Sequence, residues 1–254
     1  MNVYTDPHTH LLQSDLPALY HPARTAPGEQ VVVEGDEARH LRALRVGHNQ
    51  RVVLLDGAGG MAEARLLSSG REQAQLEVER SVVVVREPWP YIRLAFGILD
   101  DRARNEWLVE KATELGAREL IPLYTERGGE RWNAERARRI AVAALKQSRR
   151  AWLPLLAEPV QLRTLLHHPR GENERVHFFH ERAEQQRTPD ALDAVHPIAR
   201  EDHLLLLVGP EGGFSQKEVA DAEAQGAEVL SLGPIRLRAE TAALVALAAT
   251  RSRG

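Results

Sequence analysis

Two short glycine-containing turns near the carboxyl end of this 254-residue chain constrain its fold more than any other feature. They lie within Leu204–Leu247, at Gly209–Gly213 and Leu232–Pro234, and each follows an apolar strand-like run and leads into a helix-like segment. Such turns expose backbone N–H and C=O groups where no side chain blocks a ligand. In a parallel α/β sheet, two of them lie side by side at the carboxyl ends of neighbouring strands. The pattern predicts a small-molecule pocket here.

Strand-like and helix-like segments alternate from about residue 89 onward. Asn133 is a predicted helix cap, Ser215–Glu218 form a capping box, and Gly116 and Gly226 follow predicted helix ends. This alternation predicts a mostly parallel sheet covered by helices on both faces. The expected strands are 92–99, 119–124, 176–180, 203–208 and 228–232, and the expected helices are 104–116, 133–150, 215–225 and one from 239.

The part before residue 88 has a different pattern. Short apolar runs separated by glycine turns predict a small β-barrel or sandwich over 28–88, with a short basic helix over 39–46. Residues 1–27 are rich in Pro, His and Thr and are expected to be an irregular lead-in. We therefore predict a lead-in (1–27), a β domain (28–88) and an α/β domain (89–254), with the boundary near Arg86–Pro90.

Composition excludes several classes of protein. The chain has no cysteine, so disulfides and thiolate sites are excluded. It has no apolar run of membrane-spanning length and no signal-like amino terminus, so we expect a cytoplasmic protein without a membrane partner. The net charge of −3 argues against a uniformly basic protein, yet one segment is strongly basic. Between positions 131 and 150 the only acidic residue is Glu135, and the basic residues are Arg131, Arg136, Arg138, Arg139, Lys146, Arg149 and Arg150.

Other candidate motifs are weak. His8 and His10 form a His-x-His pair, but no strand precedes them and no further ligands converge, so we expect no metal site. The chain lacks a Gly-x-Ser-x-Gly nucleophile motif and a Gly-x-Gly-x-x-Gly dinucleotide loop. Glu211, in the first glycine turn, would repel a pyrophosphate and favours a zwitterionic or cationic ligand. Arg238 and Glu240 are open to a simpler interpretation, a surface ion pair at a helix start.

Together these motifs resemble one family. The segments LLVGPEGGFSQKEV and SLGPIRLRAETAA are similar to the C-terminal signature of the bacterial 16S ribosomal RNA uridine N3-methyltransferases, S-adenosylmethionine-dependent enzymes of the SPOUT class. The resemblance continues upstream in residues 110–117, Pro122, Glu126–Arg127 and 147–150. Residues 40–60 resemble the N-terminal PUA-like RNA-binding barrel of the same family.

The resemblance implies a fold and a set of partners. The expected fold is α/β, with a C-terminal SPOUT parallel-sheet methyltransferase domain closed by a trefoil knot and a small N-terminal PUA-like β-barrel. The implied cofactor is S-adenosyl-L-methionine, the implied substrate is 16S rRNA of the 30S subunit, and the implied assembly is a homodimer. Three loops would hold the cofactor, through Phe179, His180, Gly209, Pro210, Glu211, Gly212, Leu232, Gly233, Leu237, Arg238, Glu240 and Thr241.

The same resemblance suggests roles for arginines. Arg238 and Arg150 are expected to stabilise the uracil oxyanion. Trp132 or Trp152 would stack on bases, and no residue is marked as the base that takes the N3 proton. Arg104 replaces a lysine usual in the family, and the roles of Arg236 and residues 1–16 stay open. The predicted RNA contacts are Arg39, Arg42, Arg45, Arg104, Arg139 and Arg149.

Two alternatives remain from the sequence. One is a related SPOUT enzyme that methylates a ribose 2′-oxygen or another base. The other is a non-catalytic RNA-binding factor with a β-barrel domain.

Overall fold

The computed structural model describes residues 15–84, 90–171, 173–181 and 203–251. The chain forms two compact units. The N-terminal unit comprises Met1–Glu87 and Val142–Leu153, and the C-terminal unit comprises Pro88–Ala141 and Pro154–Gly254. The predicted boundary at Arg86–Pro90 lies almost entirely outside the described residues.

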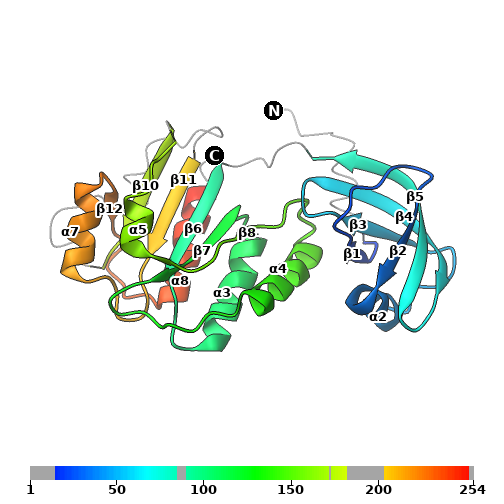
Figure 1. Cartoon of the computed structure of the whole chain (residues 1–254), viewed down its shortest axis with the longest axis horizontal. Coiled ribbons are helices and arrows are strands. Elements are labelled where there is room, and N and C mark those ends of the chain that lie inside the picture. Colours follow the sequence, from blue (N-terminus) through cyan, green and yellow to red (C-terminus); the bar gives the residue numbers. More distant parts are fainter. Residues whose placement is uncertain (1–14, 85–89, 172, 182–202, 252–254) are drawn as a thin grey trace. The chain divides into compact units, whose positions relative to one another are not determined.

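A five-stranded sheet forms the N-terminal unit, in the order β1-β3-β4-β5-β2 (Figure 1). Neighbouring strands are antiparallel except for the parallel pair β1–β3. One helix, α2, follows β2 directly. The elements are β1 (Ala18–Tyr20), β2 (Gln30–Glu34), α2 (Gly35–Ala43), β3 (Arg51–Leu55), β4 (Gly60–Ser69) and β5 (Gln73–Val83). The predicted β-rich domain is confirmed. Its short helix is present but lies at Gly35–Ala43, where 39–46 was expected.

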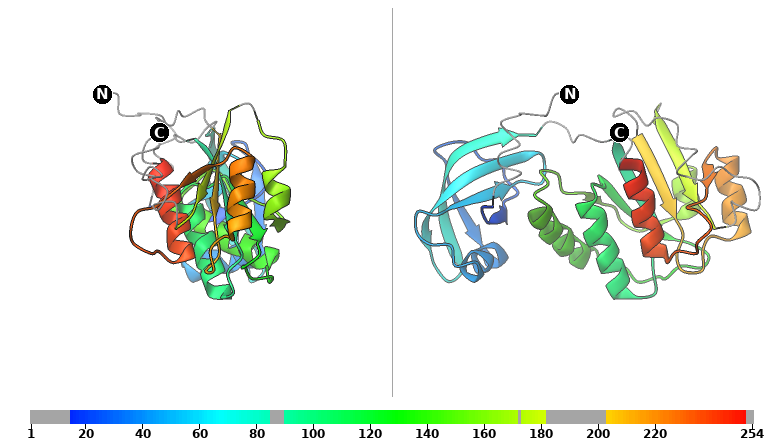
Figure 2. Two further views of the ribbon diagram at one scale, coloured as in Figure 1. Left: turned by 90° about the vertical axis from the view of Figure 1, so that its left-hand side faces the viewer. Right: turned by 180° about the vertical axis from the view of Figure 1, so that it is seen from behind.

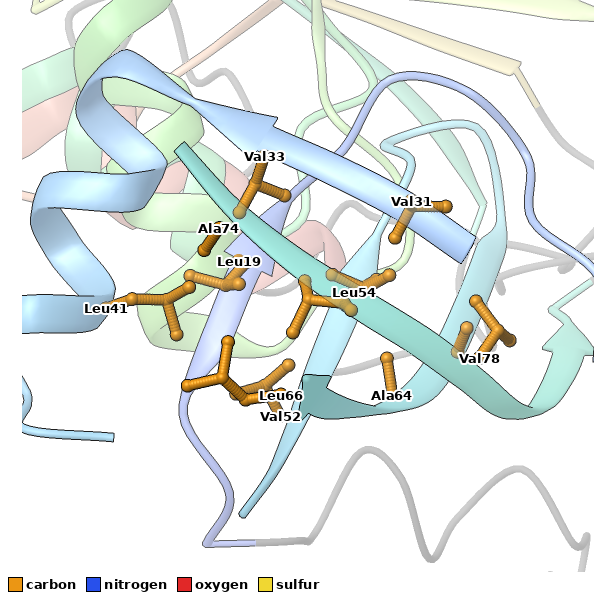
Figure 3. Packing of buried hydrophobic residues seen from close by; sticks show 12 residues of the cluster. Leu19, Val31, Val33, Leu41, Val52, Leu54, Ala64, Leu66, Ala74 and Val78 are labelled. Atoms are coloured by element: carbon orange, nitrogen blue, oxygen red, sulfur yellow. The ribbon is translucent and has the colours of Figure 1, made fainter. Parts of the chain in front are cut away.

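Alternating side chains build the core of this sheet. In β2, Val31 and Val33 are buried whereas Val32 is 42% exposed, as expected for a strand with one face on the core. Leu41 from α2 packs into the same cluster, and Figure 3 shows it beside the strand side chains. The helix therefore covers one end of the sheet's apolar face.

The structure differs from the sequence prediction in the segment 1–27. Ala18–Tyr20 form β1, where an irregular lead-in was expected, and each residue pairs with one in β3. Leu19 is fully buried in the core. Three residues are too few to show a period of two, so the pattern carried no strand signal.

The second half of α4 (Ala134–Ser148) belongs to the N-terminal unit by its contacts, although the sequence placed it in the second domain. Leu145 and Ala151 pack with Val53 of β3. The Lys146 ammonium lies 2.7 Å from a carboxylate oxygen of Glu37 in α2. These contacts are between residues far apart in the chain, so local sequence could not reveal them.

The C-terminal unit is built on a seven-stranded sheet. Its order is β12-β10-β11-β6-β7-β8, with β9 also paired to β7, and every pairing is parallel. The strands are β6 (Tyr91–Gly97), β7 (Glu119–Tyr124), β8 (Leu155–Leu156), β9 (Val160–Gln161), β10 (Glu174–Phe179), β11 (His203–Val208) and β12 (Glu228–Leu230). The helices besides α4 are α3 (Arg102–Glu114), α5 (Leu162–Leu166), α7 (Gln216–Ala224) and α8 (Ala239–Arg251).

Helices cover both faces of this sheet, as predicted (Figures 1 and 2). On one face, α5 and α7 contact each other, and Leu205 and Phe178 of the sheet pack with Ala222 of α7. On the other face, α3 packs against α8, and α8 contacts β11 and β6. Because both faces are covered, β11 is buried from Leu204 to Val208. Its continuous apolar run follows from this.

The predicted caps are confirmed. Asn133 Oδ1 accepts a hydrogen bond from the Arg136 N–H at 2.9 Å, and Ser215 with Glu218 forms the capping box of α7. The short elements β8, β9 and α5 were not predicted, because two-residue strands and a five-residue helix carry almost no periodicity. In the described part of the chain, no helix is both long and apolar enough to cross a membrane.

One buried histidine is conspicuous in this sheet. His177 of β10 is 1% exposed, and neither ring nitrogen has a hydrogen-bond partner among the described residues. Burial, and secondly the charge of Arg175, lower its pKa from 6.5 to about 4, although a Glu228 carboxylate oxygen lies 3.5 Å from Nε2. His177 is therefore neutral in the folded protein at neutral pH.

We predict that His177 makes the fold acid-sensitive. Its stabilising effect is fully present above pH 6.5 and is lost as pH falls toward 4, because the unfolded chain then binds a proton that the folded chain excludes. The loss amounts to at most roughly 3 kcal/mol. Thermal unfolding of His177→Phe between pH 7.5 and pH 5 should show a smaller loss of Tm than the wild type. The exposed His168→Phe is the control, and equal pH dependence in all three proteins would contradict the prediction.

Candidate functional site

The carboxyl ends of four adjacent strands, β12, β10, β11 and β6, lie at one level of the C-terminal sheet. Val208 pairs with Phe179 of β10 on one side and with Phe96 of β6 on the other. Leu230 of β12 also pairs with Phe179. The loops that follow β10, β11 and β12 therefore leave the sheet together. The prediction that the two glycine turns follow neighbouring strands is wrong, because β10 lies between β11 and β12.

These loops enclose two cavities that share part of their walls. The cavities have volumes of about 340 and 630 Å³, and Phe179, His180, Val208 and Leu237 line both. Volumes of this size are typical of small-molecule sites, which range from about 300 to 1,000 Å³. We call the two together the carboxyl-end cleft.

The loop from β11 to α7 lies close against β6. A Cβ atom on Gly97 would lie 2.5 Å from both N and Cδ of Pro210, so only glycine fits there. Gly213 has a φ of +65°, and its N–H donates to the Pro210 carbonyl at 2.8 Å. These contacts hold the turn tightly while leaving it without bulky side chains.

The segment after β7 clamps the same loop. Arg127 Nη1 donates to the Gly212 carbonyl at 3.0 Å. One carboxylate oxygen of Glu218 accepts from the Glu126 N–H at 2.9 Å, and the other accepts from the Ser215 N–H at 2.8 Å. The Glu218 carboxylate thus joins the capping box to the β7–α4 segment.

The third loop runs from β12 into α8. Gly233 has a φ of +99°, and its N–H donates to Ser231 Oγ at 3.1 Å. Ile235 is 75% exposed, so this loop presents an apolar side chain to solvent at the cleft. Arg236, whose role the sequence left open, lies 3.5 Å from a carboxylate oxygen of Glu181.

An ion cluster lies at one end of the cleft. Arg104 of α3 donates from Nε to Glu240 at 3.0 Å and from Nη1 to Glu211 at 2.7 Å. The hydrogen bond with Glu240 raises the pKa of Arg104 further above its usual value. Burial acts to raise the pKa of Glu240, but hydrogen bonds from Arg104 and the backbone outweigh it and lower that pKa. Both groups are therefore charged at neutral pH, and Arg104 links the starts of α3 and α8 to the first glycine turn.

The structure brings most of the predicted cofactor residues together. Gly212, Glu240 and Thr241 do not line either cavity. Glu240 is buried and forms an ion pair with Arg104. The predicted residues that line the cleft are Phe179, His180, Gly209, Pro210, Glu211, Leu232, Gly233, Leu237 and Arg238.

The two predicted catalytic arginines lie in different units. Arg238 is exposed and lines the larger cavity immediately before α8. Arg150 is 6% exposed within the N-terminal unit and lines neither cavity. Of the two, only Arg238 lines the cleft, and the role of both residues in catalysis stays a prediction.

Three predicted RNA contacts lie around α2. Arg39, Arg42 and Arg45 are all exposed. Arg39 pairs with Asp36, and the Arg42 guanidinium donates to the Arg71 carbonyl. These three arginines therefore place cationic groups at the surface of α2 and of the turn that follows it.

The other predicted RNA contacts have different environments. Arg139 is exposed on α4 and lies 3.4 Å from Glu135. Arg149 is partly buried, donates to the Leu16 carbonyl, and has a pKa lowered by burial. Arg149 therefore holds the segment before β1 through the Leu16 carbonyl. Arg104 is paired with Glu211 and Glu240 at the end of the cleft.

Some residues of the site were not among the predicted site residues. Asp101, Glu181, Ser231 and Ala242 line the cleft, and Arg127 supports it from outside. Ser231 and Ala242 lie within the signature segment SLGPIRLRAETAA, and Arg127 lies within the Glu126–Arg127 pair, but none of the three was predicted as a site residue. The others are ordinary residue types whose role depends on where the loops meet.

A metal centre finds no support in the described residues, where no group of three or more His, Asp and Glu side chains is placed to hold an ion. His8 and His10 lie outside these residues.

Comparison with known proteins agrees with this geometry. Residues 87–251 match the family model described as an RNA methyltransferase domain, and residues 33–79 match one described as an RNA methyltransferase PUA domain. Ribosomal RNA small subunit methyltransferase E of Mycobacterium bovis is 32% identical over 235 residues, which cover 87% of this chain and 86% of the relative.

Two solved structures are similar over nearly the whole chain. Ribosomal RNA small subunit methyltransferase E from Neisseria gonorrhoeae, bound to S-adenosyl methionine, has a TM-score of 0.83 at 28% identity, covering 92% of this chain and 96% of that one. A putative methyltransferase from Legionella pneumophila, in complex with the same cofactor, has a TM-score of 0.83 at 26% identity, covering 94% and 98%.

The fold, the cleft and the two family models together define an RNA methyltransferase with a PUA domain. Within that class, the chain belongs to the ribosomal RNA small subunit methyltransferase E family.

We predict that Gly97→Ala disrupts the cleft. The added methyl group would displace Pro210, so stability should fall by about 1–3 kcal/mol and the first glycine turn should lose its position. Thermal unfolding and calorimetric titration with S-adenosylmethionine would measure both effects. The matched control is Gly171→Ala, where an added Cβ meets nothing within 4 Å. Wild-type stability and affinity in Gly97→Ala would contradict the assignment.

Proposed function

We propose that this protein methylates N3 of a uridine in 16S ribosomal RNA, with S-adenosylmethionine as methyl donor. Membership of the ribosomal RNA small subunit methyltransferase E family supports the substrate. The observation that carries the proposal is the meeting of three loops, after β10, β11 and β12, around one cleft. Related structures of the same family hold S-adenosyl methionine.

The cleft fits such a cofactor chemically. Gly209, Gly213 and Gly233 place backbone groups beside it without side chains, as hydrogen bonding to an adenosine requires. Phe179 and Val208 give it an apolar wall. When bound, S-adenosylmethionine supplies a methyl group on a positively charged sulfur for transfer to N3.

The residues of this chain act on the uracil. Its N3 carries a proton at neutral pH, and that proton must leave before or during the reaction. A guanidinium held at a uracil carbonyl stabilises the oxyanion that results, and Arg238 is exposed in the cleft for this task. We infer that water accepts the proton, because none of the described residues that line the cleft is assigned as the base.

Glu211 and Glu240 are not free carboxylates. Both are paired with Arg104, so their charges stabilise the loops and the start of α8. We infer that Glu211, the more exposed of the two, is the one that faces the cationic cofactor.

The proposal includes the location of the protein, its substrate particle and its oligomeric state. The protein acts in the cytoplasm on the 30S subunit, as a homodimer whose methyltransferase domain is closed by a trefoil knot. Exposed Arg39, Arg42, Arg45 and Arg139 bind RNA phosphates. Arg104 and Arg149 serve mainly to hold the fold.

The decisive experiment is methylation of small-subunit particles, naked 16S RNA and tRNA, followed by mass mapping of the modified nucleoside. We expect N3-methyluridine in 16S RNA, and a loss of about 10²–10³ in kcat for Arg238→Ala with cofactor binding retained. The exposed Arg163→Ala, on α5 of the opposite face, is the matched control.

Three results would contradict the proposal in different ways. A ribose 2′-O-methyl product would identify another reaction of the same class. Absence of S-adenosylmethionine binding would indicate a non-catalytic RNA-binding factor. Full activity of Arg238→Ala would remove Arg238 from the mechanism.

A further inference from the structure

A third cavity lies within the C-terminal unit, outside the carboxyl-end cleft. Its volume is about 390 Å³, within the range of small-molecule sites. Its walls come from the β6–α3 junction, the first turns of α3 and the segment that leads into α4. We call it the α3–α4 cavity. Neither the ion cluster nor the three loops of the cleft contribute to it.

An aromatic ring forms part of its wall. Trp132 is half-buried, and its ring rests on Phe96 of β6 with centroids 5.7 Å apart and planes tilted by 60°. Its indole N–H has no hydrogen-bond partner among the described residues. Phe96 thus supports the Trp132 ring from the core side, and the ring adds apolar surface to the cavity.

Three arginines line the same cavity as Trp132. Glu106 accepts hydrogen bonds from Arg136 at 2.9 Å and from Arg102 at 2.8 Å, and these bonds lower its pKa. The carboxylate therefore stays ionised and holds both guanidiniums in place. Arg131 is exposed and makes no ion pair with any residue that the structure describes. Three arginines thus face two lining carboxylates, Glu106 and Asp100.

The cavity adjoins the cleft through one turn of chain. Asp101 and Arg104 line the cleft, whereas Asp100, Arg102 and Asn105 line the α3–α4 cavity. Asn105 fixes this shared turn, because its side chain accepts from the Leu99 N–H at 3.0 Å and donates to the Leu99 carbonyl at 2.7 Å. Ligands in the two sites would therefore be held at a set separation.

We propose that the α3–α4 cavity binds a nucleotide of single-stranded RNA next to the reacting uridine, with its base on Trp132 and its phosphate on Arg131. Aromatic rings beside arginines recognise base and phosphate together, in a manner that tolerates any sequence. The proposal rests on the proposed function, because it needs an RNA strand in the neighbouring cleft. The paired arginines Arg102 and Arg136 stay ordered and add to the attraction for the phosphate.

The test uses the full-length protein and a short single-stranded RNA with the sequence around the methylated uridine. We expect Trp132→Ala to weaken RNA binding about tenfold or more in fluorescence anisotropy, and Trp132→Phe to retain most of the affinity. Affinity for S-adenosylmethionine, measured by calorimetry, should stay at the wild-type value in both. The same variants should raise the KM for small-subunit particles more than they lower kcat.

A second variant avoids the packing contact with Phe96. Arg131→Glu changes only an exposed side chain, so Tm should be unchanged while RNA affinity falls and its salt dependence weakens. Arg163, which is also exposed and lies on α5, gives the matched control Arg163→Glu, which should bind RNA normally. Photocrosslinking of the wild-type protein to RNA carrying 5-iodouridine should label the peptide containing Trp132.

Two outcomes would overturn this inference. One is wild-type RNA affinity in both Trp132→Ala and Arg131→Glu. The other is crosslinking only to peptides outside the cavity, as expected if a protein segment occupies it. Neither depends on the methyl transfer itself. Conversely, a wild-type protein that binds RNA at Trp132 but does not bind S-adenosylmethionine would contradict the proposed function alone.

Discussion

The parallel pairing of β11 with its two neighbours is the constraint on which the cleft depends. Each residue of β11 pairs with one in β10 and one in β6, so Phe179, Val208 and Phe96 lie at one level. The glycine turn after Val208 can then rest against Gly97, where there is no side chain to exclude Pro210. A shift of one residue in either pairing would move every buried side chain of the strand to the opposite face. The register that fills the core is therefore the same register that aligns the loops.

Charge has two distinct uses in this chain. Arg104 and Arg149 are tied to carboxylates or a carbonyl and stabilise loops, whereas Arg131 and Arg238 are exposed beside cavities. The sequence shows where the arginines cluster, but not which of them are paired. Whether a guanidinium is free to meet a phosphate depends on whether the fold places an acceptor within its reach.

The periodic spacing of apolar residues and the helix caps made the fold predictable from the sequence. Contacts between loops that are distant in the chain were not predictable, and they form part of the site. Alternating strands and helices, the Asn133 cap and the Ser215 capping box were all recognisable locally, and the structure confirms them. The three-residue strand β1 was not recognisable. Most cleft residues followed from the glycine turns and the family resemblance. Glu181 did not, because it lines the cleft through loop geometry that no spacing rule encodes.

The strand order of the C-terminal unit also determines when the protein can fold. β6 begins at Tyr91 and pairs with β11, which begins at His203, so most of the unit must emerge from the ribosome before the centre of the sheet can close. Contacts between such distant segments carry a large loop-closure entropy and form slowly. Until then, the apolar strand β6 has only β7 as a partner. During synthesis, one edge of this buried apolar strand therefore lacks its native partner until β11 has been made.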